Sequence, residues 1–308
     1  MGDIGTTIAQ RALTGLGTVF ILVTVIFFLV RLIGDPVEIL AGPDALEAQI
    51  EAIRTRLGLD LPFYQQYLNY LWDLLRGDGG ASWRTGQSAT AMVLSRMPAT
   101  LQLGAIAILL AAVIAVPVGI IAALKPGSLV DSVSRVTAVL GQSMPIFWLG
   151  ILMILLFAVN LGWFPAGGRG TWRNMVLPGV ALSVYSIPLT MRLTRSAMLD
   201  VLNRDYIQTA RSKGLPERQV ILRHALRNAM IPVITVLALR IGHVISGALV
   251  LEEVFAYPGV GRLAVQSMLQ RDFPVVQFFV IFIAFVVIAV NLIADILYSV
   301  VDPRIRLQ

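Results

Sequence analysis

Cysteine is absent from the 308 residues of this sequence, and histidine occurs only twice, as His224 and His243. The absence of cysteine excludes disulfides, thiolate metal ligands and a cysteine nucleophile. Few carboxylates are placed to complete a metal site with the histidines, so we expect no bound metal. Charged residues are also scarce, at 14% of the chain, whereas soluble domains carry about 25%. Because 57% of the residues are hydrophobic, lipid is the expected solvent for much of this chain.

Motifs for chemistry on nucleotides or esters are missing as well. The phosphate-binding pattern G-x-x-x-x-G-K-[ST] does not occur, so any ATP and Mg that drive this chain must be bound by partner subunits. His243 and Ser246 share one helix face, but they lack a third orienting group and an oxyanion loop. Ser143 does not lie in a G-x-S-x-G elbow. We therefore expect a chain that carries no catalytic residues and is not an enzyme.

Uncharged stretches of about 20 residues predict membrane-spanning helices. Six are found, at about residues 11–33, 99–124, 135–160, 174–193, 229–251 and 275–300. The first is long for a signal peptide and no small-residue cleavage site follows it, so we expect it to be retained. The fourth contains Pro178 and Pro188, the fifth contains Arg240, and the sixth contains Asp295. The predicted fold class is an all-α membrane protein with six transmembrane helices.

The distribution of basic residues predicts the orientation. Lysine and arginine gather in cytoplasmic loops, and the most basic segment of this chain is the loop Asp200–Asn228. Placing that loop inside also places both termini inside. The short segments left outside hold few basic residues, namely Arg169, Arg173, Arg262 and Arg271. We expect a multi-pass protein of the cell inner (plasma) membrane with both termini in the cytoplasm.

The segment 34–98 is predicted to lie outside the membrane as a small helical unit between the first two spans. Residues 45–57 place Leu46, Ile50, Ile53 and Leu57 on one helix face. Pro62 starts a second helix, which ends at Gly77. The aromatic residues of this second helix suit the lipid headgroup region; they are Tyr64, Tyr67, Tyr70 and Trp72.

The basic loop Asp200–Asn228 has the pattern of two short amphipathic helices. Asn203 is placed to cap the first helix, and Gly214 can end it at positive φ. Pro216 and Glu217 can start the second helix. The apolar side of the first helix carries Tyr206, Ile207 and Ala210.

This loop has two interpretations. A basic amphipathic surface can be a solvated face beside acidic lipid headgroups. The elbow of two helices around a glycine, with an apolar side and small residues, favours insertion into the groove of a partner protein instead.

The segment Gln208–Gly214 (QTARSKG) resembles the EAA loop of ABC-importer permeases, the loop at which these permeases receive an ATPase subunit. It departs from the usual pattern because Gln208 replaces the leading Glu and because the expected Ile-Pro comes late, at Ile231-Pro232. Further motifs narrow the resemblance: Gly34-Asp-Pro36, Arg56–Pro62 (RLGLDLP), Asp205-Tyr206, Glu252 before Phe255, Pro258–Gly261 (PGVG) and Asp302–Arg306 (DPRIR). Because these motifs occur together in this order, the chain is similar to the first permease of the dipeptide/oligopeptide/nickel importer group.

The resemblance implies the type I ABC importer permease fold. Residues 1–33 would form the cytoplasmic N-terminus and first span, 34–98 the extracytoplasmic helical segment, and 99–308 a five-span core with the coupling loop 198–229. The implied partners are a homologous sister permease, two ATP-binding subunits, an extracytoplasmic solute-binding protein and membrane lipid, with no nucleic acid. The candidate ATPase-coupling residues are Asp205, Tyr206, Gln208, Thr209, Ala210, Lys213 and Gly214.

Polar residues within the spans are candidates for the substrate pathway. A charge inside a span is either functional or compensated, so Arg240 either meets an anionic group of the substrate or pairs with Asp295 or the sister chain. His243 lies on the same helix face as Arg240. Ser143 and Ser186 each precede a proline by two residues, which favours either pathway-lining carbonyls or simple packing kinks.

The turn-rich segment after the fifth span also has two interpretations. In the resembled family this region approaches the solute-binding protein, which makes candidates of Glu252, Glu253, Tyr257, Pro258 and Gly259; the alternative is a simple interfacial loop. A secondary transporter, a membrane enzyme and a scaffold subunit are competing functions, and no internal repeat supports the first of them. Among the substrates of the group, short peptides are favoured over nickel chelates, glutathione and other small solutes.

Overall fold

The computed structural model describes residues 4–33, 36–41, 45–133, 137, 143–239 and 241–301. These residues form helices joined by turns and by two longer loops, one between α4 and α5 and one before α8, with one isolated antiparallel bridge between Ala81 and Ser88. The chain divides into two compact units, and each is described by itself. One consists mainly of Ala99–Gly261, and the other consists mainly of Gly2–Pro98 with Arg262–Ala289.

Within the part of the chain that the structure describes, five helices are long and apolar enough to cross a membrane, and Ile146–Asn160 is a shorter apolar helix. The predicted spans 11–33, 99–124, 174–193 and 275–300 are confirmed as α1 (Ile4–Ile33), α5 (Ala89–Leu124), α8 (Arg173–Leu202) and α14 (Phe273–Val301). The predicted third span lies partly outside the described residues and continues as α7 (Ile146–Met153) and the π-helix η1 (Ile154–Asn160).

The sequence pattern predicted that the fifth span begins after the basic loop, at about residue 229. In the structure its helix begins within the loop. The helix starts already at α10 (Glu217–Gln219), passes through the π-helix η2 (Val220–Ala225) and continues as α11 (Leu226–Leu239). The stretch that qualifies as a span is Glu217–Leu237. α12 (Ile241–Val254) follows along the chain, so the second half of the basic loop is built directly onto a span.

In the unit that holds the N-terminal region, α3 (Glu47–Arg56) and α4 (Phe63–Leu75) confirm the two predicted helices, and α2 (Pro36–Ala41) is an additional one. Phe27 of α1 is fully buried against the rings of Phe63, Tyr67 and Tyr70. The Tyr67 and Thr24 hydroxyls share a hydrogen bond of 2.7 Å. Tyr67 and Tyr70 therefore anchor α4 to α1 rather than lying at headgroups, because burying an aromatic ring removes more than 150 Å² of apolar surface from solvent.

α4 leaves its other aromatic side chains exposed. Tyr64 and Trp72 are 67% and 55% exposed, which is the arrangement that the sequence suggested for all four aromatics of this helix. The guanidinium of Arg76 lies 4.7 Å from the centre of the Trp72 ring.

In the other unit, α5 and α8 pack closely because small residues allow the approach. A Cβ added to Gly179 would lie 2.8 Å from Ile106, and one added to Gly119 would lie 2.7 Å from the Cβ of Thr194. α7 and α12 complete a core whose fully buried residues include Leu103, Ala181, Ala248 and Leu251. The 30 residues of α8 correspond to about 45 Å of helix, so the sites at its two ends are far apart.

Candidate functional site

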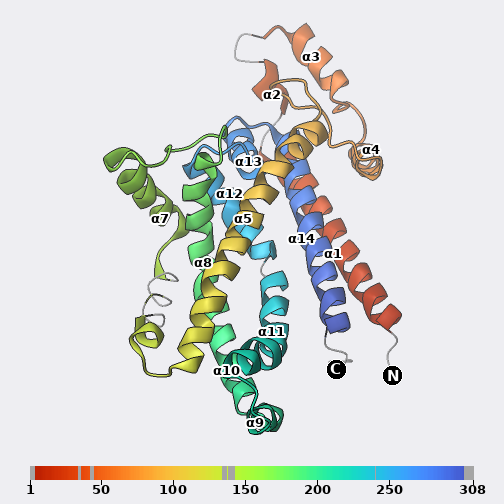
Figure 1. Ribbon diagram of the computed structural model, residues 1–308. Coiled ribbons are helices and arrows are strands. Elements are labelled where there is room, and N and C mark those ends of the chain that lie inside the picture. Colours follow the sequence, from red (N-terminus) through yellow and green to blue (C-terminus); the bar gives the residue numbers. More distant parts are fainter. Residues whose placement is uncertain are drawn as a thin grey trace. The chain divides into compact units, whose positions relative to one another are not determined.

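The basic loop forms an elbow beyond the C-terminal end of α8. α9 (Asp205–Ser212) is followed by a turn and by α10, and Figure 1 shows both helices at this end of the unit. Asn203 is the C-cap of α8, and Arg204 holds the N-cap position of α9. The prediction that Asn203 caps the elbow helix is therefore wrong: α8 continues to Leu202 and uses Asn203 as its own end.

The apolar side of α9 faces the chain itself. Ile207 is fully buried and Ala210 is 7% exposed. Both belong to a cluster with Met198 of α8, Val220 and Ala225 of η2, and with Ala123 and Ala229. Of the three residues expected on an apolar side that inserts into a partner's groove, Ile207 and Ala210 are instead covered by α8 and η2, and Tyr206 remains exposed.

The outward side of α9 is polar. Asp205, Gln208, Thr209 and Lys213 are exposed. Tyr206 is 43% exposed, and its hydroxyl accepts a hydrogen bond of 3.0 Å from the Asn228 amide. These five residues, here called the docking face of the elbow, form the exposed side of α9 and its C-cap.

The turn of the elbow requires glycine. Gly214 has a φ of +75°, a region that a residue with a Cβ adopts at a cost of roughly 1–2 kcal/mol. No atom outside the turn lies within 4 Å of the position that its Cβ would take. The predicted role of Gly214 as the residue that ends the first helix at positive φ is confirmed.

An ion pair braces the turn from α9 to α10. Arg211 donates to both carboxylate oxygens of Glu217, at 3.2 and 2.7 Å. The hydrogen bond from Arg211 holds the pKa of Glu217 below its ordinary value, and the same bond raises the pKa of Arg211. Both side chains are exposed, so this brace shapes the turn rather than supplying much stability.

A second ion pair lies at the same end of α8, between two residues whose pairing was not predicted. Arg195 donates to both oxygens of Asp131, at 2.8 and 3.1 Å, and the Gly127 N–H donates to the same carboxylate at 3.0 Å. Asp131 is 1% exposed and Arg195 is 28% exposed. In the sequence Arg195 was one more basic residue of the cytoplasmic side. A buried acid close to a short loop was the only available signal, and its partner cannot be read from spacing.

The other end of this unit is organised by a buried carboxylate. Glu252, at the end of α12, is fully buried. Its Oε1 accepts a hydrogen bond from the Thr100 hydroxyl of α5, and its Oε2 accepts one of 2.7 Å from the Gly261 N–H. Thr100 in turn accepts a bond of 2.9 Å from the Val260 N–H. At the start of α13 (Val260–Leu269), the Gly261 N–H is therefore satisfied by the carboxylate and the Val260 N–H by the Thr100 hydroxyl, at a position where a helix favours negative charge.

The glycines of the PGVG motif leave room for this carboxylate. A Cβ on Gly259 would lie 2.1 Å from the Glu252 Cδ, and one on Gly261 would lie 2.4 Å from the Leu249 Cα. Tyr257 is also fully buried, and its hydroxyl bonds to Gln102 at 3.4 Å. Burial raises the pKa of Tyr257 above the usual tyrosine value.

The residues predicted to lie on the binding-protein side therefore differ in their exposure. Glu252, Tyr257 and Gly259 are buried, and Pro258 is half-buried. The three buried residues shape the turn. Glu253 is exposed and Pro258 is half-buried, so these two of the predicted residues have surface that a partner could contact.

The predicted pathway residues are not brought together as a set. Arg240 lies outside the described residues, as does the side chain of Asp295, its suggested partner. His243 and Ser143 are exposed, whereas Ser186 is 4% exposed within the helix packing. In this conformation Ser186 lines no open path.

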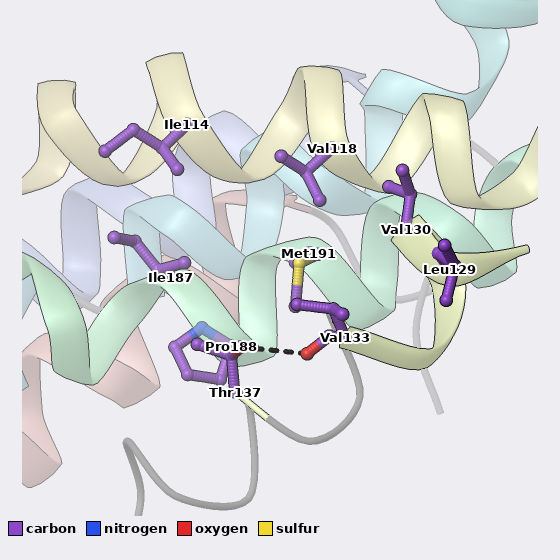
Figure 2. A pocket seen from close by; sticks show the side chains of 9 residues that line it. All are labelled: Ile114, Val118, Leu129, Val130, Val133, Thr137, Ile187, Pro188 and Met191. Atoms are coloured by element: carbon purple, nitrogen blue, oxygen red, sulfur yellow. Dashed lines mark hydrogen bonds between the residues drawn. The ribbon is translucent and has the colours of Figure 1, made fainter.

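A cavity of about 430 Å³ lies beside Pro188. Figure 2 shows it between α5 and α8, and the residues that line it are Ile114, Val118, Leu129, Val130, Val133, Thr137, Ile187, Pro188 and Met191. The single hydroxyl, from Thr137, donates to the Val133 carbonyl at 2.8 Å. Because the remaining lining is apolar, this cavity offers nothing to a hydrophilic substrate, and the ring of Pro188 acts here as packing.

Two family models match the chain. "Binding-protein-dependent transport system inner membrane component" matches residues 115–307, and the corresponding N-terminal model matches residues 6–104. The di/tripeptide transport system permease protein DppB of Pseudomonas aeruginosa is 41% identical, with 98% of each chain covered. The oligopeptide transport system permease protein AppB of Bacillus subtilis is 41% identical, covering 89% of this chain and 90% of that one.

Solved structures show the same fold. The MetNI methionine ABC transporter in an inward-facing conformation aligns with a TM-score of 0.58 at 18% identity, over 68% of this chain and 96% of that chain. An amino acid ABC transporter crystallised with histidines aligns with a TM-score of 0.53 at 17% identity, over 70% and 95% of the two chains. The expected importer permease fold is confirmed, and the chain belongs to the family of inner-membrane components of binding-protein-dependent transport systems.

Proposed function

We propose that this chain is one permease subunit of an ABC importer for short peptides. The observation that carries the proposal is the match along almost the whole chain to relatives named for di/tripeptide and oligopeptide transport. A nickel chelate, glutathione or another small solute is the alternative cargo. The chain itself performs no bond chemistry in this proposal, and ATP with Mg is bound by partner subunits.

The partners are a homologous sister permease, two ATP-binding subunits and an extracytoplasmic solute-binding protein. The docking face of the elbow receives one ATPase. The inward side of α9 then carries the movement into the membrane, because Ile207 and Ala210 pack on Met198 of α8 and on η2, and η2 continues into α11. The elbow acts as a rigid lever on two helices at once.

Orientation follows from the same assignment. The elbow and both termini lie in the cytoplasm, and the carboxylate node at Glu252 lies toward the outside. Basic residues on the elbow support this orientation, since cytoplasmic loops are enriched in them. The segment 34–98 is then extracytoplasmic, and residues 99–308 form the five-span core.

The test is uptake by the complete importer in proteoliposomes, with the solute-binding protein outside and ATP inside. A radiolabelled tripeptide is expected to accumulate only when ATP, binding protein and all permease and ATPase subunits are present. Collapse of the proton and sodium gradients with ionophores is expected to leave uptake unchanged. Uptake that follows an ion gradient without ATP would instead identify a secondary transporter.

A further inference from the structure

α12 exposes one narrow stripe of its surface, and the stripe is polar. The structure describes every residue of this helix, and its exposed residues are His243, Ser246, Val250 and Glu253. Their spacing of three, four and three residues keeps them within roughly 80° of the helix circumference. The opposite side is buried and apolar apart from Glu252, with Val244, Ile245, Ala248 and Leu251 in the core. The stripe is therefore the side of α12 that the described residues of this chain leave uncovered.

The place of the stripe on the chain makes its chemistry unusual. α12 follows α11 along the chain, and the stretch that qualifies as a span ends at Leu237, so His243 is the residue of the stripe nearest that span in sequence and Glu253 is the farthest from it. An ionisable side chain that faces lipid is unfavourable, so such residues face water or another polypeptide. By contrast, exposed residues of α5 such as Leu109 and Val113 are apolar, as expected for a lipid-facing side.

The polar groups of the stripe suit a positively charged ligand. Glu253 is an exposed carboxylate at the end of α12 remote from the elbow. Ser246 uses its hydroxyl proton on the Gly242 carbonyl at 3.1 Å, which leaves its oxygen lone pairs on the stripe. A carboxylate, a hydroxyl oxygen and an imidazole together offer acceptors to a cation, and an extended chain of three or four residues covers roughly 10–14 Å, similar to the roughly 15 Å of helix rise between His243 and Glu253.

We propose that Glu253 is the residue that receives the α-ammonium group of the peptide at the outer end of a water-filled passage, with Ser246 and His243 following along the same stripe. The proposal rests on the proposed function, because it requires a peptide cargo and the elbow on the cytoplasmic side. It assigns selectivity for a free amino terminus to the permease itself, in addition to whatever the binding protein selects.

The absence of cysteine makes a direct test available. Val250→Cys places a single thiol on the stripe, three residues before Glu253. In the complete importer this thiol is expected to react with water-soluble methanethiosulfonates, and faster with the cationic trimethylammonium reagent than with the anionic sulfonate reagent. A unit charge about 7 Å away changes the local concentration of a monovalent ion roughly threefold even at the dielectric constant of water. The rate ratio is expected to approach one in Val250→Cys/Glu253→Gln.

Leu109→Cys is the matched control, since Leu109 is exposed on α5 and is expected to react with neither charged reagent. The importer is then trapped in its ATP-bound state and mixed with a saturating amount of binding protein loaded with trialanine. This addition is expected to slow the reaction of the thiol in Val250→Cys. That protection is expected to disappear when Glu253 is replaced by Gln. An unreactive Val250→Cys would show that the sister chain covers the stripe and would overturn the proposal.

Equal rates for the two reagents with Glu253 present, or protection that persists in Glu253→Gln, would also overturn it. The proposed function fails in a different measurement: the wild-type importer would then take up no peptide in the proteoliposome assay. The reagent rates do not depend on that outcome.

Discussion

Removal of the buried carboxylate at Glu252 is expected to be the most damaging single change at the end of the helical unit remote from the elbow. Glu252→Ala leaves the Thr100 hydroxyl and the Gly261 N–H without their acceptor, and both groups are buried. Each orphaned buried donor costs about 1–3 kcal/mol, so the expected loss is about 2–6 kcal/mol. At about 2–4 °C per kcal/mol for a chain of this size, the melting temperature should fall on the order of 10 °C.

Glu252→Gln is the matched control. The amide keeps the volume and can still accept from the Gly261 N–H, but its NH₂ group cannot accept from the Thr100 hydroxyl, which already accepts from the Val260 N–H. One orphaned donor should cost about 1–3 kcal/mol, so the loss is expected to be about half that of the alanine variant. The assay is thermal unfolding of the purified permease pair, followed by the fluorescence of tryptophan, of which this chain has five.

Gly259→Ala tests the same node from the other side. Its Cβ would lie 2.1 Å from the Glu252 Cδ, so the variant should also be destabilised. Glu252→Ala removes the atoms with which that Cβ clashes, and the double variant should therefore lose less than the sum of the two single losses. A Glu252→Ala variant that melts within about 1 °C of wild type would refute this explanation of the Glu252 hydrogen bonds. So would a double variant whose loss equals the sum of the two single losses.

Three further predictions concern the elbow end. Asp131→Ala leaves the half-buried Arg195 without its carboxylate and should lower the unfolding free energy by about 2 kcal/mol. Asp131→Asn should lose less in the same melting assay, because its side-chain oxygen can still accept from the Gly127 N–H. Gly214→Ala should cost about 1 kcal/mol through its positive φ and speed proteolysis within the elbow, whereas Gly214→Asn should be milder; equal rates would contradict the strain argument. Because the pKa of Glu217 is lowered in the folded protein, its bond to Arg211 should persist above the ordinary glutamate pKa and be lost as the pH falls through the lowered value. A spin label on the elbow should then gain mobility at acidic pH in wild type but show no pH step in Glu217→Gln.

Much of this architecture could be predicted from the sequence because it depends on local signals. Uncharged runs predicted the spans at α1, α5, α8 and α14, since hydrocarbon tolerates few charges. Gly214 was identified as the end of the elbow helix because positive φ restricts the choice of residue. The helices α3 and α4 were predicted from hydrophobic periodicity and from a proline at the start of the second one.

Other features depend on partners that are distant in the sequence. The apolar side of α9 was expected to meet another protein, but Met198 and Val220 cover it, and amphipathicity alone does not say which surface an apolar side meets. The Glu252 carboxylate bonds to Thr100, 152 residues away, which no local pattern can predict. The same limit applies to Arg195 and Asp131.

The central claim is that the elbow docks an ATPase through its outward polar side and not through its apolar side. Gln208→Cys, the single thiol in this chain, can be labelled with a benzophenone maleimide and illuminated in the complete importer. The account predicts a crosslink to an ATP-binding subunit from Gln208, and none from the control Trp172→Cys, which is exposed at the opposite end of α8. No crosslink from Gln208, or one from both positions, would contradict it.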